Sequence, residues 1–184
     1  SLREATKMAE TAQAHGVHIM IGGLLSHSGP VQGMRRLIAS GELGAVRALH
    51  SFAYTDWMLL PRVPEEVDVE RGGGVVNRQA PHQIDTIRLL GGGMLRSVRG
   101  YAGQWSGVRP CPGYYSGFFE FEDGSTATLV YDAYGYFTTA ELVPWAGDRG
   151  IGGSTAETRA AIRSGLLNGT GLQRELERKQ AIRL

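Results

Sequence analysis

Residues 71–85, RGGGVVNRQAPHQID, contain side chains that could exchange a proton with a bound ligand. Pro81 is typical of a helix start, so we expect His82 in the first helical turn, with Asp85 one turn later. Backbone N–H groups at a helix start favour the neutral imidazole over the imidazolium by about 0.3–1 kcal/mol. A neutral imidazole can accept a proton near neutral pH, as a general base must. His82 is therefore the candidate general base and Asp85 the candidate residue that orients it; the alternative is a histidine that caps or packs.

The same stretch could also hold a ligand. Its three glycines, 72–74, let the backbone approach a flat ligand closely, which core packing does not require. Arg78 lies four residues before His82, and a guanidinium there could bind a carboxylate with two parallel hydrogen bonds. The alternative for Arg78 is a solvated surface side chain.

Three other patterns suggest ligand binding less clearly. His27, in LLSHSG, follows an apolar run, and ligands of open α/β sheets bind beyond strand ends; a loop-structural role is the alternative. His15 and His18 are spaced like a metal-binding pair, but Gly16 separates them and no cysteine or acidic cluster accompanies them, so we expect no metal site. Residues 147–162, GDRGIGGSTAETRAAI, lack the spacing of nucleotide-binding glycine motifs, and we expect a loop followed by a helix there.

The elements that must position these side chains follow from the apolar patterns. Ser1 and Glu4 fit a capping box for a helix over 1–16, and the nearly all-apolar stretch 17–23 is typical of a strand buried in a parallel sheet. Asp123–Gly124 is expected to form the turn of a hairpin over 114–137. The other expected elements are helices over 30–44, 81–93, 155–167 and 171–183 and strands over 45–60 and 94–105. Helices with a largely antiparallel sheet indicate an α+β fold.

Composition excludes several classes of protein. The chain has 184 residues and a formal net charge of +1, which gives no long-range attraction to nucleic acid or to an anionic membrane. No apolar run approaches the roughly 20 residues that a membrane span needs. Cys111 is the single cysteine, which indicates a reducing compartment. We therefore expect a soluble cytoplasmic protein that binds neither nucleic acid nor membrane.

Several stretches together resemble a known family. SLREATKMAETAQAHGV, IGG…SHS, RRLIASGELGAV and GGGVVNRQAPHQIDTIRLLGG occur in an order and spacing, over roughly the first 100 residues, that resemble the glucose–fructose oxidoreductase/inositol dehydrogenase (Gfo/Idh/MocA) family. SHS, PRVPEE and RQAPHQID resemble most its branch of phthalate dihydrodiol (4,5-dihydroxyphthalate) dehydrogenases.

The resemblance implies a domain organisation. Residues 1–24 would be the last helix and strand of an N-terminal Rossmann domain, and residues 25–184 a substrate-binding and oligomerisation domain that is shortened at its C-terminus. That domain would be an open, largely antiparallel sheet with helices on one face. The family's glycine-rich fingerprint, Glu-Lys-Pro segment and hydride-transfer lysine are not in this sequence. NAD or NADP would therefore be bound by the missing N-terminal domain, and the isolated chain would be inactive.

The resemblance also implies a reaction. The family places an acid four residues before its catalytic histidine, which His82 matches, but Arg78 occupies the acid's position. This departure disfavours a sugar-type polyol and suits an anionic substrate. The implied reaction is the oxidation of a secondary alcohol, such as a cis-dihydrodiol of an aromatic carboxylate, by hydride transfer to nicotinamide. His82 would take the hydroxyl proton and Arg78 would hold the anion. Weaker candidates for the pocket wall are His27, Asp56 and Trp57.

The aromatic hairpin predicts association, because a sheet face that exposes aromatic side chains needs cover. We expect a homodimer or a higher homo-oligomer through the sheet face. Two alternatives to an enzyme remain at this point. One is a non-catalytic sensor or scaffold on the same fold, which the arginine in place of the acid favours; the other is an oligomerisation module without a ligand.

Overall fold

The computed structural model describes residues 1–142, 155–169, 171, 175, 179 and 181. The glycine-rich part of the 147–162 stretch and most of the helix expected over 171–183 lie outside the described residues. Within these ranges, no helix combines the length and the apolar character that crossing a membrane requires.

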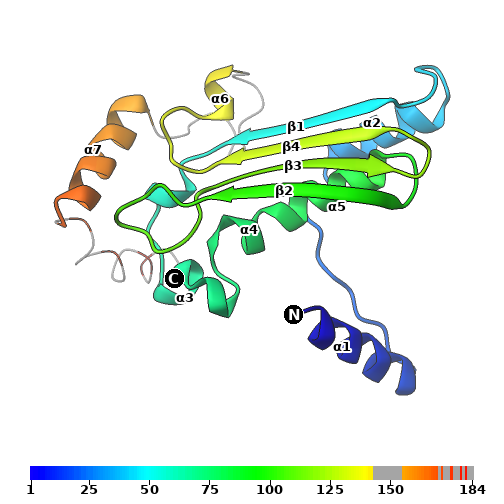
Figure 1. Cartoon of the computed structure of the whole chain (residues 1–184), viewed down its shortest axis with the longest axis horizontal. Coiled ribbons are helices and arrows are strands. Elements are labelled where there is room, and N and C mark those ends of the chain that lie inside the picture. Colours follow the sequence, from blue (N-terminus) through cyan, green and yellow to red (C-terminus); the bar gives the residue numbers. More distant parts are fainter. Residues whose placement is uncertain (143–154, 170, 172–174, 176–178, 180, 182–184) are drawn as a thin grey trace.

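A four-stranded sheet forms the centre of the molecule (Figure 1). Its strands are β1 (Ala48–Tyr54), β2 (Leu95–Gly103), β3 (Tyr114–Phe121) and β4 (Thr126–Asp132), in the order β1-β4-β3-β2. β3 pairs antiparallel with β2 and with β4, whereas β1 runs parallel to β4. The expected α+β fold with an open, largely antiparallel sheet is therefore confirmed.

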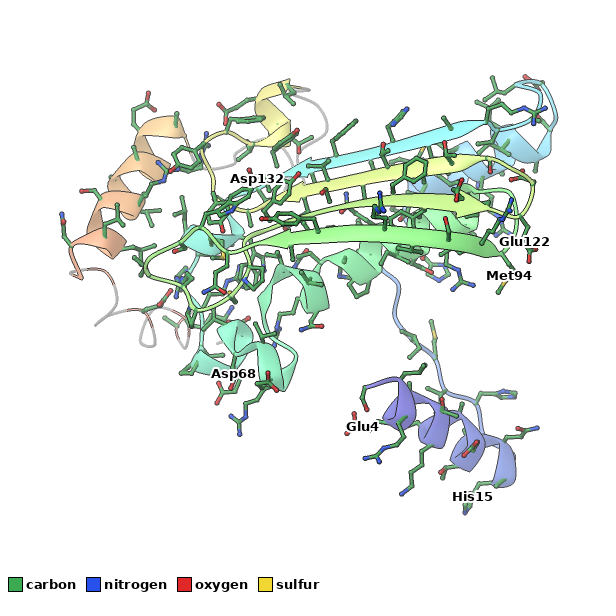
Figure 2. All side chains as sticks on the ribbon, viewed as in Figure 1. Glu4, His15, Asp68, Met94, Glu122 and Asp132 are labelled. Atoms are coloured by element: carbon green, nitrogen blue, oxygen red, sulfur yellow. The ribbon has the colours of Figure 1, made fainter. Side chains whose placement is uncertain are left out.

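The β3–β4 hairpin follows its sequence pattern closely. Phe119 and Phe121 are 5% and 1% exposed, whereas Glu120 and Glu122 face solvent, as period-2 alternation predicts. Gly124 takes φ +82° in the turn, a conformation that favours glycine. Near this turn, the backbone N–H of Glu122 donates to the carbonyl of Met94 at 3.0 Å, which brings the beginning of β2 to the same end of the sheet (Figure 2).

Helices cover one face of the sheet. α5 (Ala80–Leu90) contacts β1 and β4, α4 (Gly74–Arg78) contacts β3, and α2 (Gly29–Ala39) packs on α5 (Figure 1). The core beneath α5 consists of apolar side chains from the helix and the two central strands: Ile87, Phe119, Phe121, Ala127 and Leu129. The shorter elements are η1 (Trp57–Leu59), α3 (Pro64–Val67), η2 (Val69–Arg71) and α6 (Thr139–Leu142), and α7 (Ala156–Leu167) follows.

The N-terminal segment confirms one prediction and corrects another. α1 (Leu2–Ala14) begins with the expected capping box between Ser1 and Glu4. The strand expected over 17–23 is absent: the segment has no regular secondary structure, and Met20 and Ile21 are 85% and 81% exposed. A strand of this apolar type needs paired strands and cover on both faces, and the described part of the chain supplies neither to this segment.

The strand expected over 45–60 is shorter than predicted. β1 ends at Tyr54, and the chain turns at Asp56 into η1, whose three residues are all buried. Apolar residues continue past the end of β1 because they pack into the core as a 3₁₀ turn rather than as a strand. Sequence pattern alone does not separate these two outcomes for a short apolar run.

Candidate active site

His82 lies where the sequence predicts it, in the first turn of α5. The N-cap is Gln79, and Pro81 is the second helical residue rather than the first, which makes His82 the third. The backbone N–H of His82 donates to the Gln79 carbonyl at 3.1 Å. The side chain of His82 is half-buried. An imidazole in this place lies close to the positive end of the helix and can still be reached by a ligand.

Asp85 faces the segment that precedes α2. A Cβ atom at Gly23 would come within 2.6 Å of Asp85 Oδ2 and 2.9 Å of Ser26 Oγ, so the backbone of Gly23 approaches the carboxylate more closely than other residues could. The side-chain oxygen of Thr86 donates to the carbonyl of His82 at 2.9 Å. Asp85 is exposed and its carboxylate lies next to Gly23, and its orientation of the His82 ring stays a prediction.

The turn that carries His27 is held next to this contact. Ser26 is buried and donates from Oγ to the Gly23 carbonyl at 2.9 Å, while Gln32 Nε2 donates to the Ser26 carbonyl at 2.6 Å. His27 itself is exposed. His27 therefore directly follows Ser26 in a hydrogen-bonded turn, and its assignment to a pocket wall stays a prediction.

Arg78 is the last residue of α4 and is 41% exposed, and its Nη1 lies 3.9 Å from Glu66 Oε1. The buried Glu66 also accepts from the Val63 N–H at 3.0 Å, from Lys179 Nζ at 3.2 Å and from Arg62 Nη1 at 3.5 Å. Burial raises the pKa of Glu66, but these hydrogen bonds and cations outweigh it and hold the pKa below its usual value. Arg78 therefore lies beside a carboxylate whose ionised form is favoured, at a distance that leaves most N–H groups of Arg78 without a hydrogen bond to Glu66.

Asp56 and Trp57 are buried at the start of η1. The guanidinium carbon of Arg62 lies 3.8 Å from the centroid of the Trp57 ring, and Arg62 Nη2 donates to the Trp57 carbonyl at 3.0 Å. Arg62 also pairs with Glu66, and Glu66 in turn lies beside Arg78. The side chains of Arg62 and Glu66 therefore connect Trp57 to Arg78. Their assignment to a pocket wall stays a prediction.

This charged cluster contains residues that the sequence reasoning missed. Arg109 is 5% exposed; its Nη1 donates to Glu175 Oε2 at 2.9 Å, and its Nε donates to the Met58 carbonyl at 3.2 Å. Arg62 and Glu66 of the cluster lie in the charged stretch 61–72, PRVPEEVDVERG, whereas Arg109 and Glu175 are far from it in the sequence and no local pattern connects them. Charged side chains in a loop are usually solvated, and only the tertiary fold shows that Glu66 and Arg109 are buried.

A cavity of about 320 Å³ opens between the α4–α5 segment and strands β2 and β3. Ala80 and Ile84 line the cavity, and each is two positions from His82 along α5. Residues two positions apart project to nearly opposite sides of a helix, so the His82 side chain projects away from this cavity. Its walls are mainly apolar, with Tyr115 among them. Among the described residues, no three His, Cys, Asp or Glu side chains gather as metal ligands.

The sequence of this chain is similar to those of known proteins. The family model of the GFO/IDH/MocA C-terminal domain matches residues 31–143. The 1-carboxy-3-chloro-3,4-dihydroxycyclohexa-1,5-diene dehydrogenase of Comamonas testosteroni is 37% identical over 150 residues, which are 82% of this chain and 38% of that protein.

Solved structures share the fold. The crystal structure of a Bordetella bronchiseptica RB50 protein, whose name gives it as a dehydrogenase, matches with a TM-score of 0.83 and 33% identity over 95% of this chain and 46% of its own. An inositol dehydrogenase homologue from Azotobacter vinelandii, in complex with NADH and myo-inositol, matches with a TM-score of 0.64 and 19% identity over 76% of this chain and 37% of its own. The chain spans less than half the length of these relatives. By the match of residues 31–143, the chain belongs to the GFO/IDH/MocA family and carries its C-terminal domain.

Proposed function

We propose that the whole protein is an NAD(P)-dependent dehydrogenase that oxidises a secondary alcohol of a carboxylated ring. The observation that carries this proposal is a half-buried imidazole, His82, in the first turn of α5, one helical turn before Asp85, whose carboxylate lies next to Gly23. Family membership and the names of the relatives, which are dehydrogenases, support it. The name of the Comamonas relative describes a ring with one carboxylate and two hydroxyls, which is the substrate class we propose, with a cis-dihydrodiol of phthalate type as the specific candidate.

The chemistry of this chain is the removal of a proton. The nicotinamide would supply the hydride acceptor for the hydrogen on the carbinol carbon. The hydroxyl proton passes to the neutral imidazole of His82, so that a C–H and an O–H bond break and a carbonyl forms. Asp85 is proposed to orient the ring, and His27, Asp56 and Trp57 to contribute to the wall of the pocket.

The substrate's carboxylate is proposed to bind Arg78. Its guanidinium is partly exposed, and only one long contact joins it to Glu66, so it can present two parallel N–H groups to an anion. Arg78 and His82 lie on either side of the turn at Gln79, and we propose that one substrate contacts both.

We propose that the nicotinamide is bound mainly outside this sequence. A dinucleotide site needs a glycine-rich turn at the start of a helix, and the sequence contains no Gly-x-Gly-x-x-Gly. We therefore assign no residue of this chain to the cofactor, and we propose that the chain alone does not turn over substrate. A cytoplasmic location is proposed because the single cysteine, Cys111, is buried and unpaired.

The test of this function is His82→Gln in the whole enzyme. Loss of a general base lowers the rate by about 10²–10⁴-fold, so kcat for a carboxylated dihydrodiol should fall by that factor. His15→Gln, on the exposed end of α1, is the matched control and should leave kcat unchanged. Normal turnover by His82→Gln would show that the proton leaves by another route and that the assignment of His82 is wrong.

A further inference from the structure

Gln83, the residue after His82, is a polar side chain in a position that is otherwise apolar. The face of α5 that packs on the sheet consists of residues spaced three or four apart: Ala80, Gln83, Ile84, Ile87 and Leu90. Gln83 is 6% exposed. An apolar side chain would fill the same space without needing hydrogen-bond partners. A buried amide, by contrast, destabilises the fold unless its N–H and C=O groups are hydrogen-bonded.

The amide of Gln83 joins the helix to three strands. Its Nε2 donates to Ser51 Oγ on β1 at 2.8 Å and approaches the Val130 carbonyl on β4 at 3.4 Å. Its Oε1 accepts from the Tyr115 hydroxyl on β3 at 2.5 Å. Burial, with the neighbouring Tyr131, raises the pKa of Tyr115, so the phenol stays protonated and keeps donating. Both ends of the amide are therefore satisfied by fixed partners.

This arrangement fixes the rotation of α5 about its own axis. Consecutive side chains of a helix project about 100° apart, so a fixed direction for Gln83 also fixes the direction of His82. Apolar contacts alone tolerate small rotations and shifts, whereas a fully satisfied buried polar network specifies one arrangement. We propose that Gln83 is a positioning residue that sets the direction of the His82 imidazole toward the substrate. This inference rests on the proposed role of His82.

The test replaces Gln83 in the whole enzyme by methionine, which has a similar volume and no hydrogen-bonding amide. A displacement of a catalytic group by about 1 Å can cost on the order of 100-fold in rate, so kcat per folded active site should fall by about 10-fold to 100-fold with KM little changed. Ile87→Val, on the same buried face of the same helix, is the matched control. It should lower the melting temperature and leave kcat per folded site unchanged, because it removes packing without changing the amide network.

A double-substitution cycle separates positioning from a merely structural role. If Gln83 acts through His82, Gln83→Met should cause no further loss of kcat in a His82→Gln background. Tyr115→Phe removes one hydrogen bond of the network from the other side; it should give a smaller loss in the same direction, which also disappears in that background. This variant serves the test if Gln83→Met does not fold.

The outcomes distinguish this inference from the proposed function. If His82→Gln turns over normally, the proposed function and this inference both fail. If His82→Gln is impaired but Gln83→Met behaves like Ile87→Val, only the positioning role is wrong. A loss from Gln83→Met that persists in full in the His82→Gln background would also overturn it, because the amide would then act independently of the imidazole.

Discussion

Arg78 shows how far single residues could be interpreted from the sequence. Its sequence position predicted either a surface side chain or an anion clamp, and the structure gives a partly exposed guanidinium beside the buried Glu66. His82 was placed correctly because Pro81 marks a helix start locally. The contact between Arg78 and Glu66 could not be predicted, because it depends on how η2 and α3 fold back on α4.

Arg78→Ala in the whole enzyme should raise KM for a carboxylated dihydrodiol. A hydrogen bond to a charged group contributes about 1.5–3 kcal/mol, so we expect an increase of about 10-fold to 100-fold. KM for the uncarboxylated dihydrodiol should not change, since that substrate has no anion to lose. Arg88→Ala, at an exposed position of α5, is the control. An unchanged KM for the carboxylated substrate would show that Arg78 serves only to pair with Glu66.

At the scale of elements, the connection from α5 to β2 shows why this chain uses glycine where it does. Gly91 ends α5, and a Cβ atom there would overlap the buried ring of Phe121 and come within 2.8 Å of the Ile87 carbonyl. The helix can end this close to the sheet only because the side chain is missing. By contrast, Gly33 lies inside α2 with open space around the position of its Cβ.

These two glycines should therefore respond in opposite ways to alanine. Gly91→Ala overpacks a site bounded by a buried ring and by backbone, so the free energy of unfolding should fall by about 1–3 kcal/mol. Gly33→Ala removes a flexible residue from a helix interior and should raise it by about 0.5–1 kcal/mol. Urea unfolding followed by circular dichroism measures both values. Equal effects of the two substitutions would mean that the close contact at Gly91 does not form.

The elements also separate what the sequence can and cannot predict. The capping box of α1, the turn at Gly124 and the alternation in β3 are local patterns, and each prediction was confirmed. The apolar segment 17–23 was wrongly predicted as a strand, because a strand depends on neighbours that a local pattern does not contain. Gln83 was missed for the same reason, since its partners lie on three different strands.

At the scale of the whole molecule, the two faces of the sheet differ. The helices α4 and α5 cover one face, and the side chains of the other project away from them. On that outer face, the pairing of the strands places Phe52 next to Val130 and Tyr101 next to Ser116, with Phe118 beside them on β3. Phe52, Tyr101 and Phe118 are 52%, 59% and 43% exposed. We define the outer patch as Phe52, Tyr101, Phe118 and Val130.

We propose that a second copy of the chain covers the outer patch, because aromatic side chains gathered on one open face are typical of protein–protein interfaces. Light scattering should then give the mass of a dimer or of a larger homo-oligomer. Phe118→Glu places a charge within the patch, opposite Arg99 on β2, so it should leave the monomer folded while it weakens association.

Leu43→Glu tests whether this effect depends on the place of the charge. Leu43 is 64% exposed but lies in the turn after α2 and is not part of the outer patch, so this variant should associate like the unmodified chain. The melting temperatures of the two variants show whether either change unfolds the monomer. If the unmodified chain is a monomer, the proposed interface is wrong. If Phe118→Glu and Leu43→Glu associate equally well, the interface lies on a surface other than the outer patch. Because the patch and the helical layer lie on opposite faces, association through the patch would leave His82 and Arg78 open to substrate in every copy.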